Sequence, residues 1–265
     1  MNRSELLELY DRQVRIDLEQ PGVRREVFPH LVRQVRPSPG MNTVSYSRLE
    51  GMDLDAVIDQ EVAYFRSLEQ PFSWQVCEHD APPVLKERLL AHGFRPEGDP
   101  DAVLVLELAE APPALREPVP DFVRPVRESS RLPELARLQE TVYGGNFGWM
   151  VERLGGHLQV PGYLDIFLAS PGGEPSCCGW IYFHPNSQFA GLYGGSTLPE
   201  RRGQGLYTAV LAARVQAAIR RGYRFLHTGA SPMSRPILER NGFRRLTRQF
   251  GLDWEEKRKE RYCPN

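Results

Sequence analysis

The stretch LYGGSTLPERRGQGLY, residues 192–207, joins a predicted strand to a long predicted helix at 205–221. Glycines 203 and 205 let the backbone of the connecting loop approach a ligand closely and adopt conformations that other residues avoid. The first amides of a helix have no intrahelical acceptor, and with the helix dipole they form an anion site. Arg201 and Arg202 add positive charge there. The stretch predicts a pyrophosphate site, and a tight turn before a helix is the alternative.

Strands and helices alternate on both sides of this loop. Glycine-rich loops of the Rossmann and P-loop types are excluded, because the chain has neither their Gly-x-Gly-x-x-Gly nor their Gly-Lys-Ser/Thr pattern at this point. The patterns in the C-terminal half predict strands at 122–126, 164–169, 178–183, 189–195, 223–228 and 243–252, and helices at 132–142, 205–221 and 232–241.

The N-terminal half repeats the order strand, helix, strand, helix, Gly-Phe, strand. Its patterns predict helices at 6–16, 23–35, 54–68 and 83–92, and strands at 43–49, 72–76 and 102–108. Gly93-Phe94 and Gly242-Phe243 occupy the same place in the two halves, which indicates an internal duplication. Prolines between the halves predict a linker. We therefore expect an N-terminal lobe at 1–109, a linker at 110–121 and a catalytic domain at 122–265.

Composition narrows the possible partners. The 265 residues carry a formal net charge of −1, which argues against a protein that coats nucleic acid or an anionic membrane. No apolar stretch is long enough to span a bilayer, and the first residues lack the apolar core of a signal peptide. We expect a cytoplasmic monomer or homodimer. Four cysteines without a Cys-x-x-Cys pair predict idle thiols and no metal site: Cys77, Cys177, Cys178 and Cys263.

The loop resembles the signature motif of the GNAT N-acetyltransferase superfamily, Arg/Gln-x-x-Gly-x-Gly/Ala, which maps onto Arg202 to Tyr207. Thr197-Leu-Pro-Glu200 resembles the strand end that precedes this motif, and residues 231–243 resemble the late motif that closes on Gly-Phe. The resemblance spans residues 122–252. It implies an α/β (α+β) fold, with a mixed, mostly antiparallel central sheet flanked by helices and a second, smaller GNAT-like lobe.

The resemblance also implies acetyl-CoA as cosubstrate, with no metal. In this superfamily the fourth strand bulges and splays from the fifth, and acetyl-CoA lies in the gap. The pantetheine arm would pair with Ser196, Thr197 and Leu198. The pyrophosphate would meet the amides of Arg202, Gly203, Gln204, Gly205, Leu206 and Tyr207. The N-terminal half has no such loop, since 48–54 holds a single glycine.

Two departures from the pattern concern the chemistry. Tyr207 stands where the motif ends in glycine or alanine, so its ring points away from the phosphates or lies in the cleft. Leu238 stands where many members carry the tyrosine that protonates the leaving thiolate, and Ser231 replaces a frequent asparagine. We expect Tyr193, Ser231 and Ser234 as candidates for the proton transfers. The alternatives are that Tyr193 is a core or lid aromatic, and that Ser231 and Ser234 only cap the N-terminus of the helix that follows them. His227 ends the fifth strand and is a further candidate, or a structural histidine.

The glycine-rich aromatic loop 143–149 lies between the first two helices of the C-terminal half, where the superfamily covers its acceptor site. Tyr143, Asn146, Phe147 and Trp149 are therefore candidate substrate-binding residues on a mobile lid, or a hydrophobic plug. We expect an acetyl-CoA-dependent N-acetyltransferase acting on a primary amine of a small molecule or peptide. The alternatives are a non-catalytic CoA-binding sensor or scaffold, which Leu238 favours, and an acyltransferase for longer acyl chains.

Overall fold

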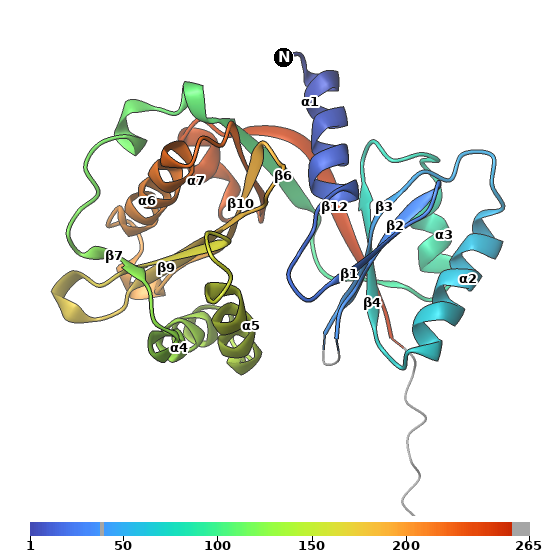
Figure 1. Ribbon diagram of the computed structural model, residues 1–265, viewed down its shortest axis with the longest axis horizontal. Helices are drawn as coiled ribbons and strands as arrows, with labels where there is room; N and C mark the ends of the chain where they lie inside the picture. The colour runs from blue at the N-terminus through green and yellow to red at the C-terminus, as the bar shows by residue number, and fades with distance from the viewer. Residues whose placement is uncertain (38–39, 256–265) are drawn as a thin grey trace, which may run out of the picture. The chain divides into compact units, whose positions relative to one another are not determined.

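A computed structural model describes residues 1–37 and 40–255 (Figure 1). The chain forms two compact units, one of residues 1–102 with 247–255 and the other Val103–Leu246. This division differs from the expected boundaries. The proline-rich segment is part of the second unit and contains 3₁₀ turns at Leu108–Glu110 and Pro113–Leu115. The last strand, β12 (Arg244–Trp254), ends in the first unit, because residues 249–254 pair with β4 (Phe72–Cys77).

The second unit is built on a mixed, mostly antiparallel sheet, as expected. Its strands lie in the order β7 (Val123–Val126), β8 (Leu164–Ala169), β9 (Cys177–Phe183), β10 (Phe189–Thr197), β11 (Phe225–Ala230) and β6 (Asp101–Glu107). The pairs from β7 to β10 are antiparallel, and β10 and β11 are parallel. A parallel pair needs a crossover, and α6 (Leu206–Arg220) supplies it.

Helices cover both faces of this sheet. The helices α4 (Leu132–Tyr143) and α5 (Gly148–Leu158) lie on one face, and α6 lies on the other (Figure 1). Side chains alternate accordingly along β9. Cys178 and Trp180 join the core under α4 and α5, whereas Gly179 lies against the buried guanidinium of Arg214 on α6. The short helix α7 (Arg235–Arg240) precedes β12.

The first unit has its own sheet and core. Its strands lie in the order β1 (Arg24–Val27), β2 (Leu31–Val35), β3 (Asn42–Ser47), β4 and β12, with β5 (Arg95–Pro96) also on β12. The helices are α1 (Arg3–Tyr10), which continues as a π-helix over Asp11–Ile16, α2 (Leu54–Ser67) and α3 (Leu85–Ala91). A stacked pair, Phe65 and Phe72, lies in the core between α2 and β4.

The helix expected at 23–35 is wrong, because this segment forms the hairpin of β1 and β2. Pro29 lies in the middle of the segment, where it would interrupt a helical hydrogen bond. Every residue of β2 is buried, and the pairing of β2 with β1 and β3 outweighs the helical spacing of the apolar residues.

The repeated order of elements is confirmed. In each unit a helix connects two parallel strands, α2 between β3 and β4, and α6 between β10 and β11. A glycine in the left-handed region follows the end of both α3 and α7, Gly93 at φ +89° and Gly242 at φ +88°. Over the described residues, every helix is too short or too polar to traverse a bilayer.

Candidate functional site

A β-bulge interrupts β10 in the second unit. Pairing with β9 runs to Tyr193 opposite Trp180 and resumes at Ser196 opposite Cys178. Between them Gly194 has φ +60°, a conformation that favours glycine. A Cβ at Gly194 would also overlap the Trp180 ring. The site therefore requires glycine for two reasons, and β10 changes direction there.

The strand β10 leaves β11 just before this bulge. In the described chain the parallel ladder comprises three pairs, from Phe189 with Phe225 to Gly191 with His227. Beyond it the Thr228 hydroxyl donates to the carbonyl oxygen of Leu192 at 3.0 Å. The segment after the bulge, which includes Ser196 and Thr197, thus presents a strand edge on the side of β11. Such an edge can pair with an extended ligand that carries amide groups.

A buried glutamine holds the bulge from α4. The Gln139 side chain is 2% exposed, and its Nε2 lies 2.9 Å from the Gly194 carbonyl oxygen and 3.0 Å from Ser196 Oγ. The same nitrogen lies 3.4 Å from Cys178 Sγ, on the neighbouring strand β9. The Gln139 side chain therefore holds both the bulge and the strand register that follows it.

The loop after β10 ends in an open helix N-terminus. A 3₁₀ turn at Pro199–Arg201 leads to Gly203 at φ +74° and to Gly205 at φ +76°, the N-cap of α6. Among the described residues, no side chain caps α6 by a hydrogen bond, and a Cβ on either glycine would meet nothing within 4 Å. Residues 202–205 are exposed. First-turn amides, open space and two arginines suit an anionic group.

The side chains of Leu206 and Tyr207 point into the unit. Leu206 is buried, and the Tyr207 ring lies 2.9 Å from where a Cβ of Gly195 would be. Burial raises the pKa of Tyr207, although the nearby Arg214 opposes this effect. The Tyr207 ring packs against Gly195 of β10 and not into the loop. The first turn of α6 therefore presents backbone amides, and no bulky side chain, at the loop.

Tyr193 stands on β10 beside the point of divergence, on the face covered by α4 and α5. Its side chain is 43% exposed, and the ring lies over Gly191, 2.7 Å from where a Cβ would be. The rings of Tyr182 and His227 contact it edge-on, with centroids at 5.5 and 6.4 Å. Burial, with a smaller effect of His184, lowers the pKa of His227 to about 3, so this imidazole is neutral near pH 7.

The serines expected to act near the leaving sulfur lie together in the turn between β11 and α7. Ser231 Oγ lies 3.3 Å from Ser234 Oγ and accepts from the Ser234 amide at 3.4 Å. Ser231 is exposed and Ser234 is half-buried. Leu238 is 2% exposed on α7, so the position where an acid is frequent holds a core side chain.

The aromatic loop presents a row of rings. Tyr143 and Trp149 are 61% and 52% exposed, while Phe147 packs against the core under α4 and α5. The Phe147 ring centroid lies 6.3 Å from that of Tyr143 and 6.2 Å from that of Trp149. Asn146 Oδ1 accepts from the Gly148 amide at 2.7 Å, which gives it a local role at the start of α5.

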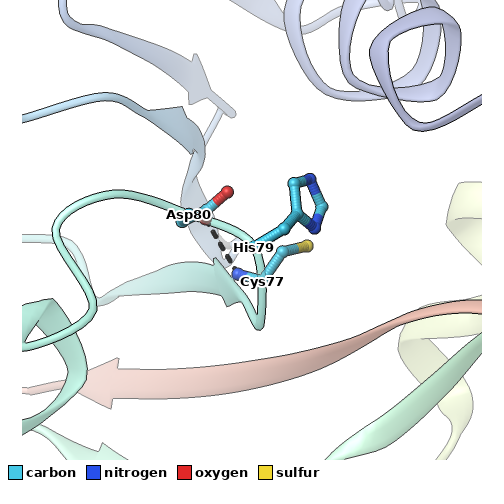
Figure 2. Close-up of side chains that lie close together, drawn as sticks. All are labelled: Cys77, His79 and Asp80. Atoms are coloured by element: carbon cyan, nitrogen blue, oxygen red, sulfur yellow. Dashed lines mark hydrogen bonds between the residues drawn. The ribbon is translucent and has the colours of Figure 1, made fainter. Parts of the chain in front are cut away.

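A cluster of possible metal ligands lies in the first unit. Ligand atoms of Cys77, His79 and Asp80 lie within 4.8 Å of one another (Figure 2). The Asp80 oxygens accept from Arg15 at 2.6 and 2.7 Å and from the Cys77 amide at 2.8 Å. Burial raises the pKa of the Cys77 thiol to about 12. Since a guanidinium already supplies the cation and the thiol is protonated, these contacts do not favour a metal.

The other cysteines that the structure describes, Cys177 and Cys178, are likewise buried and free, and burial raises the pKa of the Cys177 thiol to about 12. Cys263 lies outside the described residues.

Sequence reasoning missed Gln139, Trp180 and Tyr182 as parts of this region. The paired glycines 194 and 195 inside a strand are a local signal for a bulge. No local pattern marks the side chains that pack on the bulge, because they come from α4 and β9.

Comparison with solved structures identifies the fold. A GCN5-related N-acetyltransferase from Kribbella flavida aligns with a TM-score of 0.65 and 16% identity, over 96% of this chain and 95% of that one. A functionally unknown conserved protein from Staphylococcus epidermidis aligns with a TM-score of 0.65 and 14% identity, over 93% of this chain and 98% of that one. A tandem GNAT protein from the clavulanic acid biosynthesis pathway aligns with a TM-score of 0.58 and 14% identity, over 90% of this chain and 85% of that one. No family model and no curated protein matches the sequence. The chain has the GNAT fold in a two-unit form.

Proposed function

We propose that this protein is an acetyl-CoA-dependent N-acetyltransferase that modifies an amino group of a small molecule or peptide. One observation carries the proposal: a bulged β10 diverges from β11 and runs directly into a glycine loop at the open N-terminus of α6. The GNAT fold of the second unit supports acetyl transfer in general. The cosubstrate and the acceptor are our inferences from the site.

The residues around the loop fit a CoA pyrophosphate. The amides of residues 202–207 would hold its oxygens, since both glycines leave open space and α6 has no side-chain cap. The Arg201 and Arg202 side chains would add charge-assisted contacts. Residues 196–198 would pair with the amides of the pantetheine arm along the edge of β10.

The transfer requires a neutral amine and a proton for the leaving sulfur. The acceptor nitrogen attacks the thioester carbonyl carbon, a C–N bond forms and the C–S bond breaks. The proton that the nitrogen loses replaces the acetyl group on sulfur. We assign the proton donor to Tyr193, whose exposed phenol stands where the strands diverge, with the hydroxyls of Ser231 and Ser234 as second candidates. Leu238 lacks a transferable proton.

A CoA-binding sensor or scaffold is the second candidate function. The observation that favours it is the buried leucine at position 238, in place of a proton donor. The loop residues fit both functions equally well, so only turnover separates them.

Acetyl-CoA binding and thiol release test the proposal together. We expect calorimetric binding of acetyl-CoA and release of CoA thiol with at least one amine of a panel. Gly205→Asp should weaken binding at least 100-fold, because a carboxylate would face the pyrophosphate. Gly222→Asp is the matched control, since Gly222 follows the other end of α6 at φ +75° with nothing within 4 Å of a Cβ. Binding without turnover supports the sensor, and absence of binding contradicts both functions.

A further inference from the structure

Five segments beside the divergence of β10 and β11 contain no aspartate or glutamate. These segments are β9, β10, β11, the turn at 231–234 and the loop at 143–149. They supply aromatic rings, hydroxyl groups and one imidazole. The neighbouring acid on α4, Glu140, accepts from the Phe147 amide at 3.0 Å through its Oε1. The five segments therefore offer a cationic ligand no carboxylate.

Aromatic rings form the face beside the divergence. Tyr182, Tyr193 and His227 come from three adjacent strands, and Tyr193 is the exposed member. Gly191 provides the flat floor on which the Tyr193 ring lies. The titratable groups packed around these rings are phenols and imidazoles: Tyr163, Tyr182, Tyr193, His157, His184 and His227.

We propose that the acceptor is an uncharged aromatic amine, of the arylamine class, and not a cationic alkylamine or polyamine. This inference rests on the proposed acetyltransferase function. A flat apolar molecule gains area and edge-to-face contacts against such rings. An ammonium group brought to the same face would gain cation–π attraction to the rings, but it would lose hydration without gaining a carboxylate partner.

The acid–base requirement points to the same class. An alkylamine with a pKa of about 10.4 is neutral in roughly one molecule in 2,500 at pH 7, so it must lose a proton before it can attack. An imidazole, with an ordinary pKa near 6.5, is a poor acceptor for that proton. His227 is neutral and buried, which makes it a poorer one. An arylamine arrives neutral, and the enzyme then has to manage only the proton released after attack.

A matched pair of acceptors tests this inference with the full-length protein. Aniline and benzylamine differ by one methylene but differ greatly in basicity, and spermidine adds a flexible polycation. With saturating acetyl-CoA we expect kcat/KM for aniline to exceed that for benzylamine at least 30-fold at pH 7. The aniline rate should change less than twofold between pH 6.5 and 8, while any benzylamine rate rises about tenfold per pH unit.

Preference for benzylamine or spermidine would overturn the inference and leave the acetyltransferase function intact. Acetyl-CoA binding with no transfer to aniline would overturn it as well. Absence of acetyl-CoA binding would instead contradict the proposed function itself, so the two failures are distinguishable.

Discussion

The side-chain amide of Gln139 donates to the carbonyl oxygen of Gly194, across 2.9 Å between α4 and the bulge of β10. The two residues are 55 positions apart, yet this contact and the one to Ser196 Oγ at 3.0 Å fix the strand where it leaves β11. The edge that we assign to the pantetheine arm begins at Ser196. A side chain of α4, Gln139, thus helps to set the shape of the proposed CoA site.

Gln139→Leu should weaken CoA binding about tenfold while it leaves binding of 3′-phospho-ADP within twofold. The variant frees the Gly194 carbonyl and Ser196, so the β10 edge loses its register, but the glycine loop of α6 stays intact. We expect a loss of about 1–3 kcal/mol in unfolding free energy, because a buried carbonyl loses its donor. Calorimetric titration with both ligands measures the difference.

Gln216→Leu is the matched control for this experiment. Gln216 lies on α6 and donates to the carbonyl oxygens of Leu115 and Glu117 at 3.2 and 2.7 Å, so its loss removes comparable bonds elsewhere. Stability should fall without a change in CoA affinity. Equal losses of CoA and 3′-phospho-ADP affinity in Gln139→Leu would show a general unfolding effect and contradict the assigned role.

Gly194→Ala should destabilise the protein more than Gly203→Ala, by at least about 2 kcal/mol. Both glycines have positive φ, at +60° and +74°, so both variants carry backbone strain. The difference is the Trp180 ring, which a Cβ at Gly194 would overlap, whereas a Cβ at Gly203 meets nothing within 4 Å. Urea unfolding of the two variants provides the comparison, and equal losses would contradict the packing argument.

The sequence alone predicted the elements whose signals are local. The loop at Gly203 and Gly205 and the helix that follows are contiguous, so their glycines, arginines and helical periodicity can be read in one window. The order of elements in the two halves was predicted for the same reason. The matching parallel strand pairs in both units confirm that order.

Features set by distant pairing were not predictable. The segment around Pro29 has apolar spacing that suits a helix, but partners in β3 decide its structure. The end of β12 belongs to the first unit because it pairs with β4, about 175 residues earlier in the chain. No local sequence pattern distinguishes Gln139 from other polar residues of its helix, because its contact with Gly194 forms only in the folded chain.

Glu61→Gln should stabilise the protein at pH 8 and have little effect near pH 4. Glu61 is buried on α2, with Arg33 Nε at 3.5 Å from its carboxylate. Burial raises its pKa to about 7, Arg33 opposes the shift, and Glu26 adds to it. The unfolded chain loses this proton near pH 4.5 and the folded chain near pH 7. Stability therefore falls as pH rises between these values, by up to about 3 kcal/mol in total.

Urea unfolding from pH 4 to pH 8 tests this dependence. Glutamine mimics the protonated acid, so the difference between Glu61→Gln and the wild type should grow with pH and level off above pH 7. Glu8→Gln, at an exposed position, should show no such trend. A variant that is less stable than the wild type at pH 8 would mean that the Arg33 pair outweighs burial.

Arg15→Met should cost about 3–5 kcal/mol, because it leaves a buried carboxylate without its cation. Arg15 is buried and donates to both oxygens of Asp80 and, at 2.9 Å, to Asp11. The double variant Arg15→Met, Asp80→Asn should recover at least about 1 kcal/mol, since the neutral amide can still accept from the Cys77 backbone amide. Arg48→Met, at an exposed arginine, should change stability by less than about 0.5 kcal/mol. If the double variant is no more stable than Arg15→Met, loss of packing, and not an uncompensated charge, explains the cost.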